Sequence, residues 1–318
     1  MVDSMNLCDL HCDTAFELHA RGEHLSSGSL NIDLEKINTF EKYVQLSAVC
    51  AAKDDSDSDA FDRFFAVLGY FTEEVKRCSC RICSSPGDIL SAVRDNIPAF
   101  IMTVEDARLL AGKIGRLNLL FDAGVRVITP LWGGESIIGG SHESEAGLTP
   151  FGRDVAKGCA ELGIITDISH ASLRSSDELI DIAVAHGMPV IASHSCAYDV
   201  SPHSRNLRRE HLTAVVASGG IVGVNLYPPH LNGGDSECSD VGDVVKHIKY
   251  YLDETGEASV ALGCDFDGMG SRGTRGLEDV SKLPSLYSAL LGAGVSESTA
   301  ERIFFSNALA FLTENLAS

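Results

Sequence analysis

His11 and Asp13, which close the first apolar segment of the chain, have side chains that can bind a metal ion. Alternate side chains of a β-strand lie on one face, so these two residues would point the same way. An imidazole and a carboxylate on one face are suitable zinc ligands. His-x-Asp triplets are common by chance, and the alternative is a strand end whose polar side chains face solvent. The rest of the chain must decide between the two.

Side chains of the same kind follow four further apolar, β-branched segments: Glu105 after 99–104, His170 after 163–168, His194 after 189–193 and Asp265 after 259–264. The carboxyl ends of parallel strands meet at one edge, where the active sites of barrel enzymes lie. One catalytic zinc needs three protein ligands and a water, so this larger set predicts two metal ions. A carboxylate can bridge two such ions, and Glu105 is the best candidate for that position.

The order of the segments predicts the fold. Eight candidate strands alternate with helical patterns, over 5–11, 43–50, 99–104, 125–129, 163–168, 189–193, 220–225 and 259–264. This alternation predicts an α/β fold, a (β/α)8 TIM-type barrel with a C-terminal helical extension. A doubly wound sheet is the alternative, but the first strand is not followed by a glycine-rich phosphate turn. No linker divides the chain, so residues 1–318 are expected to form a single domain.

Local signals place several helix boundaries. Thr149 followed by Pro150 predicts a helix start, and Gly163 its end. Ser298 and Glu301 form a capping-box pattern, which predicts the start of a C-terminal helix. The barrel-closing helix is expected over about 279–293, and the acidic segment 54–59 is expected to cap the helix after the second strand.

Composition limits the classes of partner. The chain has 318 residues, 22% of them charged, and a net charge of −20. Nucleic acid and anionic membranes require a basic surface, so neither is expected as a partner. The N-terminus does not resemble a signal peptide and no apolar run is long enough to span a membrane, so we expect a cytoplasmic protein. In that compartment the ten cysteines would be reduced, and the cluster Cys78, Cys80 and Cys83 lacks the paired spacing of a zinc ribbon.

Four motifs in this order resemble the membrane dipeptidase (renal dipeptidase) family, a metallopeptidase branch of the amidohydrolase superfamily: Asp9–Thr14, Asp167–Ser172, Ser193–Tyr198 and Gly263–Gly268. Shorter matches at 104–105, 147–152, 205–206 and 276–280 extend the resemblance over nearly the whole chain.

The resemblance implies a role for each matching residue. His11 and Asp13 match ligands of the first zinc ion, Glu105 the carboxylate that bridges both ions and acts in catalysis, and His170 and His194 ligands of the second ion. Asp265 matches a substrate-contacting residue that transfers a proton, and Arg205 one that binds the C-terminal carboxylate of a dipeptide. The family also suggests a homodimer.

This chain departs from the family after the fourth strand, where Trp132 aligns with a substrate-contacting histidine. An indole can still donate one hydrogen bond. His142, ten residues on, is a candidate replacement, and Tyr227 could touch substrate or serve only in packing. Asp267 is expected to serve its own loop. The remaining histidines are expected on the surface or in helix packing: His19, His24, His186, His203, His211, His230 and His247.

The function predicted from the sequence is hydrolysis of dipeptides by two Zn²⁺ per chain, including dipeptides with a D-residue at the C-terminal position. Two alternatives stay open. Trp132 motivates a related hydrolase of lactones or cyclic amides, and a metal- or peptide-binding protein without turnover is the third reading.

Overall fold

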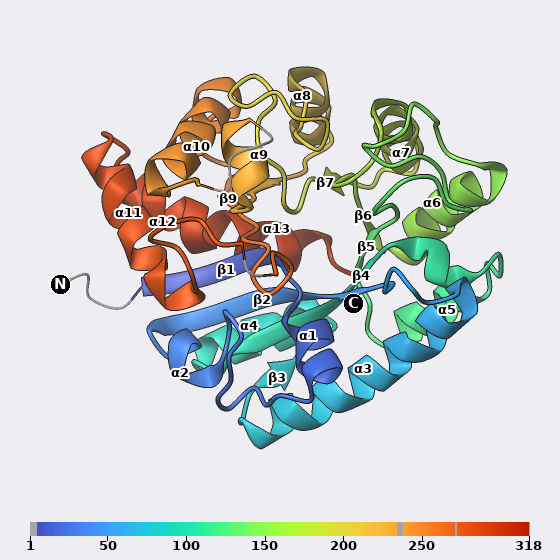
Figure 1. Ribbon diagram of the computed structural model, residues 1–318, viewed down its shortest axis with the longest axis horizontal. Coiled ribbons are helices and arrows are strands. Elements are labelled where there is room, and N and C mark those ends of the chain that lie inside the picture. The colour runs from blue at the N-terminus through green and yellow to red at the C-terminus, as the bar shows by residue number, and fades with distance from the viewer. Residues whose placement is uncertain (1–4, 234–237, 271, 318) are drawn as a thin grey trace.

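The computed structural model describes residues 5–233, 238–270 and 272–317. A parallel sheet forms the centre of the molecule, in the order β7-β6-β5-β4-β2-β1-β9-β8, and β3 pairs with the first two residues of β4 (Figure 1). A bridge between Ala192 and Val222 joins β7 to β8, so the sheet is a nearly closed barrel of the (β/α)8 type. The strands are β1 (Met5–Cys12), β2 (Phe40–Cys50), β3 (Arg81–Ile82), β4 (Ala99–Glu105), β5 (Val127–Thr129), β6 (Ile165–Asp167), β7 (Val190–Ile191), β8 (Val222–Val224) and β9 (Val260–Leu262). All eight predicted strands are confirmed, and β3 is an addition that the sequence did not indicate.

Helices surround the barrel (Figure 1). The α-helices are α1 (Thr14–Arg21), α2 (Leu34–Ile37), α3 (Asp57–Arg77), α4 (Pro86–Arg94), α5 (Arg116–Asp122), α6 (Pro150–Leu162), α7 (Leu173–Ala185), α8 (Arg209–Ala217), α9 (Pro228–Asn232), α10 (Val241–Thr255), α11 (Leu283–Gly292), α12 (Glu297–Glu301) and α13 (Asn307–Asn315). Short 3₁₀ turns lie at Ala107–Leu110 and Val280–Lys282, and a π-helical turn at Arg302–Ser306 joins α12 to α13.

The predicted C-terminal extension packs onto the barrel. Phe311 and Leu312 of α13 are buried together with strand residues such as Leu10 of β1 and Ile101 of β4. This apolar cluster is separate from the one that holds the outer helices against the sheet. The last helices therefore contribute to the core that fixes the strands.

Most of the predicted helix caps are confirmed. Thr149 accepts a hydrogen bond from Gly152 N at 3.0 Å, and Gly163 ends α6 with a left-handed φ of 73°. Within the acidic segment, Ser56 caps α3.

The capping box predicted at Ser298 is wrong, because Ser296 caps α12 by accepting from Thr299 N at 3.1 Å. Only Ser296 has the extended backbone that an N-cap requires, and Ser298 lies inside the helix. The helix predicted over 279–293 is a 3₁₀ turn followed by the shorter α11.

Candidate active site

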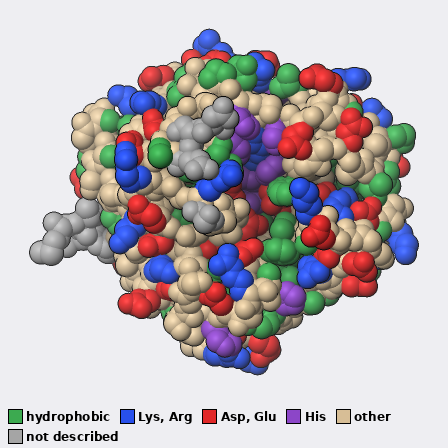
Figure 2. Space-filling view, viewed as in Figure 1, with side chains coloured by type: hydrophobic (Ala, Val, Ile, Leu, Met, Phe, Trp, Pro, Cys, Tyr) green, Lys and Arg blue, Asp and Glu red, His purple; other side chains and the backbone are tan. Residues whose placement is uncertain are grey.

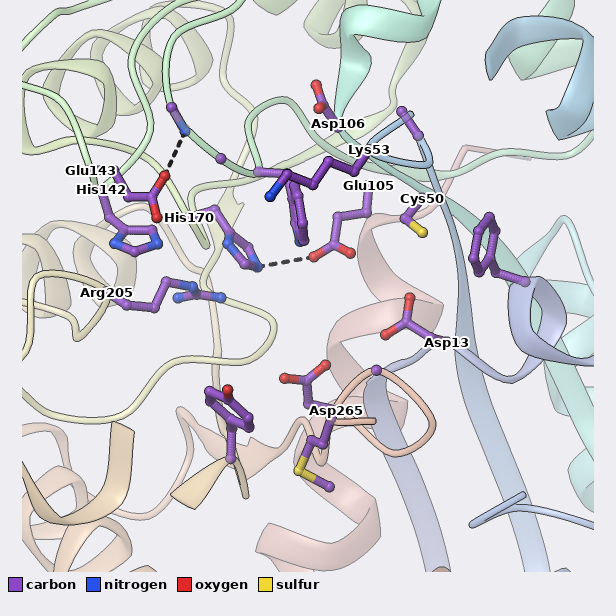
Figure 3. A pocket seen from close by; sticks show the side chains of 18 of the residues that line it. Asp13, Cys50, Lys53, Glu105, Asp106, His142, Glu143, His170, Arg205 and Asp265 are labelled. Atoms are coloured by element: carbon purple, nitrogen blue, oxygen red, sulfur yellow. Dashed lines mark hydrogen bonds and ion pairs between the residues drawn. The ribbon is translucent and has the colours of Figure 1, made fainter. Parts of the chain in front are cut away.

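A pocket of about 1000 Å³ opens where the strands end, and Figure 2 shows it as a hollow in which histidines gather with basic and acidic side chains. Residues beyond the ends of β1, β4, β6 and β9 point into it. Asp13, Glu105, His170 and Asp265 face one another there from these four strands (Figure 3). The structure thus brings together side chains that are up to 252 positions apart in the sequence, between Asp13 and Asp265.

Glu105 is the centre of the acidic and imidazole groups. Its Oε1 lies 3.0 Å from His170 Nε2, 3.4 Å from His194 Nε2 and 3.7 Å from His11 Nε2. The Nε2 atoms of His170 and His194 are 2.9 Å apart, and the rings of His11 and His194 stack with centroids at 3.7 Å. Three imidazoles from three strands therefore converge on one carboxylate oxygen.

A second group shares His11 with the first. His11 Nε2 lies 3.5 Å from Asp13 Oδ2 and 3.9 Å from Asp265 Oδ1. Asp13 occupies the N-cap position of α1, yet its carboxylate makes no capping hydrogen bond. Two atoms here, His11 Nε2 and Asp13 Oδ1, are buried and have no hydrogen-bond partner among the described residues.

These observations test whether a metal fits. Buried polar atoms without partners are rare, because each costs about 1–3 kcal/mol. Two triads, His11–Glu105–His194 and His11–Asp13–Asp265, have ligand atoms within 4.8 Å of one another. Nitrogen and carboxylate donors at such spacing are those that zinc uses, and the orphaned atoms belong to these triads. The residues therefore fit divalent-cation binding, and His11 belongs to both triads.

The electrostatics of the cluster agree with this. Burial, with Asp13 and Asp265 nearby, raises the pKa of Glu105 well above its ordinary value. Burial likewise raises the pKa of Asp265 to about 6. Burial alone would lower the pKa of His11, but the charges of Glu105, Asp13 and Asp265 raise it to about 10. The negative charges of the three carboxylates are thus not fully neutralised by their neighbours, and bound protons or a divalent cation can neutralise them.

Two residues of the site have strained backbones. His170 follows β6 with a φ of 69°, and Asp265 follows β9 with a φ of 61°. Residues other than glycine rarely adopt this left-handed region, and each instance costs about 1–2 kcal/mol. Asp106 and Asp267 share this feature. The strand ends therefore turn sharply where they carry site residues.

A buried layer beneath the site fixes His194. Ser193 Oγ donates to Asp167 Oδ2 at 2.5 Å and lies 2.7 Å from His194 Nδ1. Because the hydroxyl proton points at Asp167, Ser193 accepts from Nδ1 of the imidazole, which leaves Nε2 unprotonated toward Glu105. Thr129 Oγ1 also donates to Asp167 Oδ2, at 2.7 Å. Asp167 therefore sets the tautomer of His194 rather than entering the pocket.

Arg205 lines the pocket although it is only 4% exposed. It donates to Ser195 Oγ and to His194 O, both at 2.9 Å, and its Nε is buried without a partner among the described residues. Figure 3 shows its guanidinium beside His142 and His170. A buried cation held by neutral groups alone is suited to receive an anion.

Trp132 and His142 both line the pocket. Trp132 is 40% exposed, and its ring lies 6.5 Å from that of His170. His142 is held by a hydrogen bond from its backbone N to His170 O at 2.7 Å. Burial and the nearby Arg205 lower the pKa of His142 to about 3, so it is uncharged at neutral pH.

Sequence reasoning missed several residues in or beside the pocket. Asn225, which is buried behind the lining, donates to Asp265 Oδ2 at 3.0 Å, and Lys53 and Arg272 line the pocket. His230, expected on the surface or in helix packing, also lines the pocket, as does Tyr227. The only feature of the sequence that could have indicated these residues is their position just after a strand, or in a loop at the carboxyl end of the barrel. Asp267 serves its loop as expected, by accepting from Thr14 and Asn31 and donating through its backbone to Asn31.

The cysteine cluster lies apart from this site. Burial raises the pKa of Cys80 and Cys83 to about 12, which disfavours their thiolates. Within the described ranges, the groups of possible metal ligands do not include Cys78, Cys80 or Cys83.

The comparison with family models gives a match over residues 1–317 to the membrane dipeptidase family, peptidase family M19. The chain belongs to this family. Dipeptidase tcpJ of Claviceps purpurea is 34% identical over 231 residues, which are 71% of this chain and 53% of that protein. Dipeptidase aclJ of Aspergillus oryzae is 35% identical over 67% of this chain and 48% of its own length. The chain thus spans about half the length of these curated relatives.

Solved structures of low identity share the fold. A metallopeptidase from Rhodobacter sphaeroides, solved with a phosphinate mimic of the dipeptide L-Ala-D-Ala, superposes with a TM-score of 0.90 at 23% identity. The superposition covers 98% of this family member and 100% of the Rhodobacter chain. None of the helices in the described part of the chain is long and apolar enough to cross a membrane.

Proposed function

We propose that this protein is a dipeptidase that works with two zinc ions and hydrolyses dipeptides, including those with a D-residue at the C-terminal position. The single observation that carries the proposal is the convergence of three imidazoles on Glu105 Oε1, next to a buried arginine that forms no ion pair with a described residue. The proposed ligands are His11, Asp13, Glu105, His170 and His194.

Zinc held by these residues would polarise the scissile carbonyl and lower the pKa of water, so that hydroxide forms near neutral pH. The chain's own groups then position the substrate. Arg205 binds the free C-terminal carboxylate, because it lines the pocket, its Nε has no partner, and no described carboxylate lies within ion-pair distance of it. This contact fixes the distance from the carboxylate to the reacting bond and favours dipeptides over longer chains.

Asp265 is the proposed proton carrier. Burial raises its pKa to about 6, which is close to the pH at which it must both accept and release a proton. The amide of Asn225 holds one of its oxygens at 3.0 Å, which leaves the other facing His11. Trp132, in the place of the family histidine, can donate a hydrogen bond from its indole N–H to the substrate. The D-residue is supported by the ligand of the Rhodobacter structure.

The decisive experiment combines metal analysis of the purified chain with a panel of L,L- and L,D-dipeptides. We expect two zinc ions per chain and turnover of at least one stereochemical series. A two-zinc protein that cleaves no dipeptide would contradict the proposal.

The variant Arg205→Ala separates the dipeptidase from a lactone or cyclic-amide hydrolase, which the exposed Trp132 also suits. A dipeptidase should show a raised KM for its carboxylate-bearing substrates, whereas hydrolysis of a neutral lactone should be unaffected. Arg209→Ala, an exposed arginine paired with Glu254 at 2.6 Å, is the control. Dipeptide binding that is unchanged in Asp265→Asn, together with no turnover by the wild-type protein, would favour a protein that only binds metal or peptide.

A further inference from the structure

Two arginines in the pocket have no acidic partner among the residues that the structure describes. Of the arginines that line it, Arg108 is paired with Asp57 at 3.0 Å and Asp106 at 3.1 Å. Neither Arg205 nor Arg272 has a carboxylate of the described residues within the 4.0 Å of an ion pair. The chain carries 45 acidic and 25 basic residues, so acidic partners are abundant elsewhere. Two unpaired arginines in one pocket point to an anionic ligand from outside the chain.

The two arginines lie at the ends of a row of ring side chains. The backbone N of Arg205 donates to His203 Nδ1 at 3.1 Å, and the rings of His203 and His230 lie 4.9 Å apart. His230 contacts the ring of Tyr227 at 4.8 Å, and Arg272 Nη1 donates to the Tyr227 hydroxyl at 2.6 Å. This surface, here called the basic wall, consists of Arg205, His203, His230, Tyr227 and Arg272.

His230 shows that the basic wall has unused polar capacity. It is 9% exposed, it lines the pocket, and its Nδ1 has no hydrogen-bond partner in the described ranges. Three of the acids that line the pocket, Glu105, Asp13 and Asp265, are grouped around His11. The other acids of the lining, Glu17, Asp106, Glu135 and Glu143, form no ion pair with Arg205 or Arg272 among the described residues. The cluster around His11 therefore suits cations, and the two arginines suit an anion.

The basic wall has more positive charge than one carboxylate requires. Arg205 is enough for the C-terminal carboxylate of a dipeptide, since one guanidinium binds one carboxylate through two N–H groups. Arg272 contacts Tyr227, and Tyr227 contacts His230, so Arg272 is a separate anion-binding group rather than a second contact to the same carboxylate. A second anionic group of a dipeptide would come from a side chain. The pocket, at about 1000 Å³, has room for such a side chain.

We propose that the basic wall selects dipeptides whose C-terminal residue has an acidic side chain, with Arg205 binding the main-chain carboxylate and Arg272 the side-chain carboxylate. This inference rests on the proposed dipeptidase function. Tyr227 and His230 lie between the two arginines in the basic wall. The Nδ1 atom of His230, which has no partner among the described residues, would donate a further hydrogen bond to the second anion.

The test compares substrates that differ by charge and little else. With the zinc-loaded full chain, kcat/KM is measured for Ala-Glu against Ala-Gln, Ala-Asp against Ala-Asn, and Glu-Ala against Gln-Ala. We expect the acidic C-terminal residue to be favoured about tenfold over its amide, and the Glu-Ala pair to differ little. Equal values for the C-terminal pairs, or a preference confined to Glu-Ala, would overturn the inference.

Variants assign the preference to Arg272. Arg272→Gln should bring the ratio of Ala-Glu to Ala-Gln close to one, mainly through KM. Arg275→Gln is the matched control, because Arg275 lies on the same loop but pairs with Asp240 at 3.0 Å and does not line the pocket. A ratio that survives Arg272→Gln, or falls equally in Arg275→Gln, refutes the assignment.

Binding to the variant Asp265→Asn separates this inference from the proposed function. Calorimetry measures the dissociation constants of Ala-Glu and Ala-Gln directly, so the result does not depend on whether the protein hydrolyses them. A dissociation constant about tenfold lower for Ala-Glu, lost when Arg272→Gln is added, supports the anion subsite even if the wild-type protein cleaves no dipeptide. Equal dissociation constants would reject the subsite, whatever the fate of the dipeptidase proposal.

Discussion

Replacing Asp167 by asparagine should reverse the polarity of the hydrogen bonds that orient His194. In the wild-type protein, Asp167 Oδ1 accepts from Ser169 N and Ser193 N, both at 2.9 Å, and Oδ2 accepts from the hydroxyls of Thr129 and Ser193. The asparagine oxygen can keep the two backbone bonds, but its NH₂ group then replaces Oδ2. Ser193 must accept from that group and donate to His194 Nδ1. The imidazole proton moves to Nε2, the atom that faces Glu105 and would bind the metal.

We expect Asp167→Asn to weaken zinc binding while the protein still folds. Groups that orient a metal-binding histidine are worth about 10–100-fold in metal affinity. The exchanged hydroxyl bonds are buried, so the free energy of unfolding of the metal-free protein should also fall, by about 1–3 kcal/mol. Zinc competition with a chromophoric chelator measures the first quantity, and urea denaturation in the presence of a chelator measures the second.

Thr129→Val is the matched control for Asp167→Asn. It removes a hydrogen bond to the same carboxylate oxygen but leaves the contact from Ser193 to His194 in place. We expect about 1 kcal/mol of destabilisation and unchanged zinc affinity. If Asp167→Asn binds zinc as tightly as the wild-type protein, or if Thr129→Val weakens zinc equally, the tautomer argument is wrong.

Three further perturbations test the site and the fold. In Gly268→Ala, the new Cβ would lie 2.6 Å from Asp265 Oδ1 and closer still to Asp13 Oδ2. These two carboxylates must then move, so dipeptide kcat/KM should fall by about 100-fold while the circular dichroism spectrum stays native. A variant with wild-type kcat/KM would contradict the geometry. Burial lowers the pKa of His247 in the folded protein, so below about pH 6.5 the unfolded chain binds more protons than the folded one. The contribution of His247 to the free energy of unfolding is therefore complete above that pH and is lost as the pH falls. His247→Gln can keep both hydrogen bonds of the ring, so urea denaturation at pH 7.5 and 5.5 should show a smaller acid loss than in the wild-type protein, and identical losses would count against this account. His11→Ala should lower the zinc content and abolish turnover while the barrel still folds, and a metal-replete, active variant would refute its proposed place as a ligand.

The sequence predicted the strands and the groups at their ends because a parallel barrel links the two. Most strands are short apolar runs rich in β-branched residues, and a residue at or just after a strand end must lie at the carboxyl rim. Glu105 and His194 could therefore be placed without knowing any contact. The bridging position proposed for Glu105 is consistent with its central place in the structure. The roles proposed for these residues stay predictions until metal is measured.

What the sequence could not show depends on loops and on register. His230 lies on the five-residue helix α9, and Arg272 lies in the loop after β9, so only tertiary contacts bring them to one wall. Asp167 looks like Glu105 in the sequence, as an acid that ends a strand. Its carboxylate nevertheless points at Ser193 and Thr129, which only the register of β6 with its neighbours determines.

The left-handed backbones of His170 and Asp265 have a consequence for protein engineering. Glycine adopts this conformation without the penalty that a Cβ brings, so glycine at either position should relieve about 1 kcal/mol of strain. The same change would remove an imidazole or a carboxylate from the pocket. A library screened only for heat resistance would therefore enrich variants with a damaged site, and any stabilisation of this protein has to be selected together with turnover.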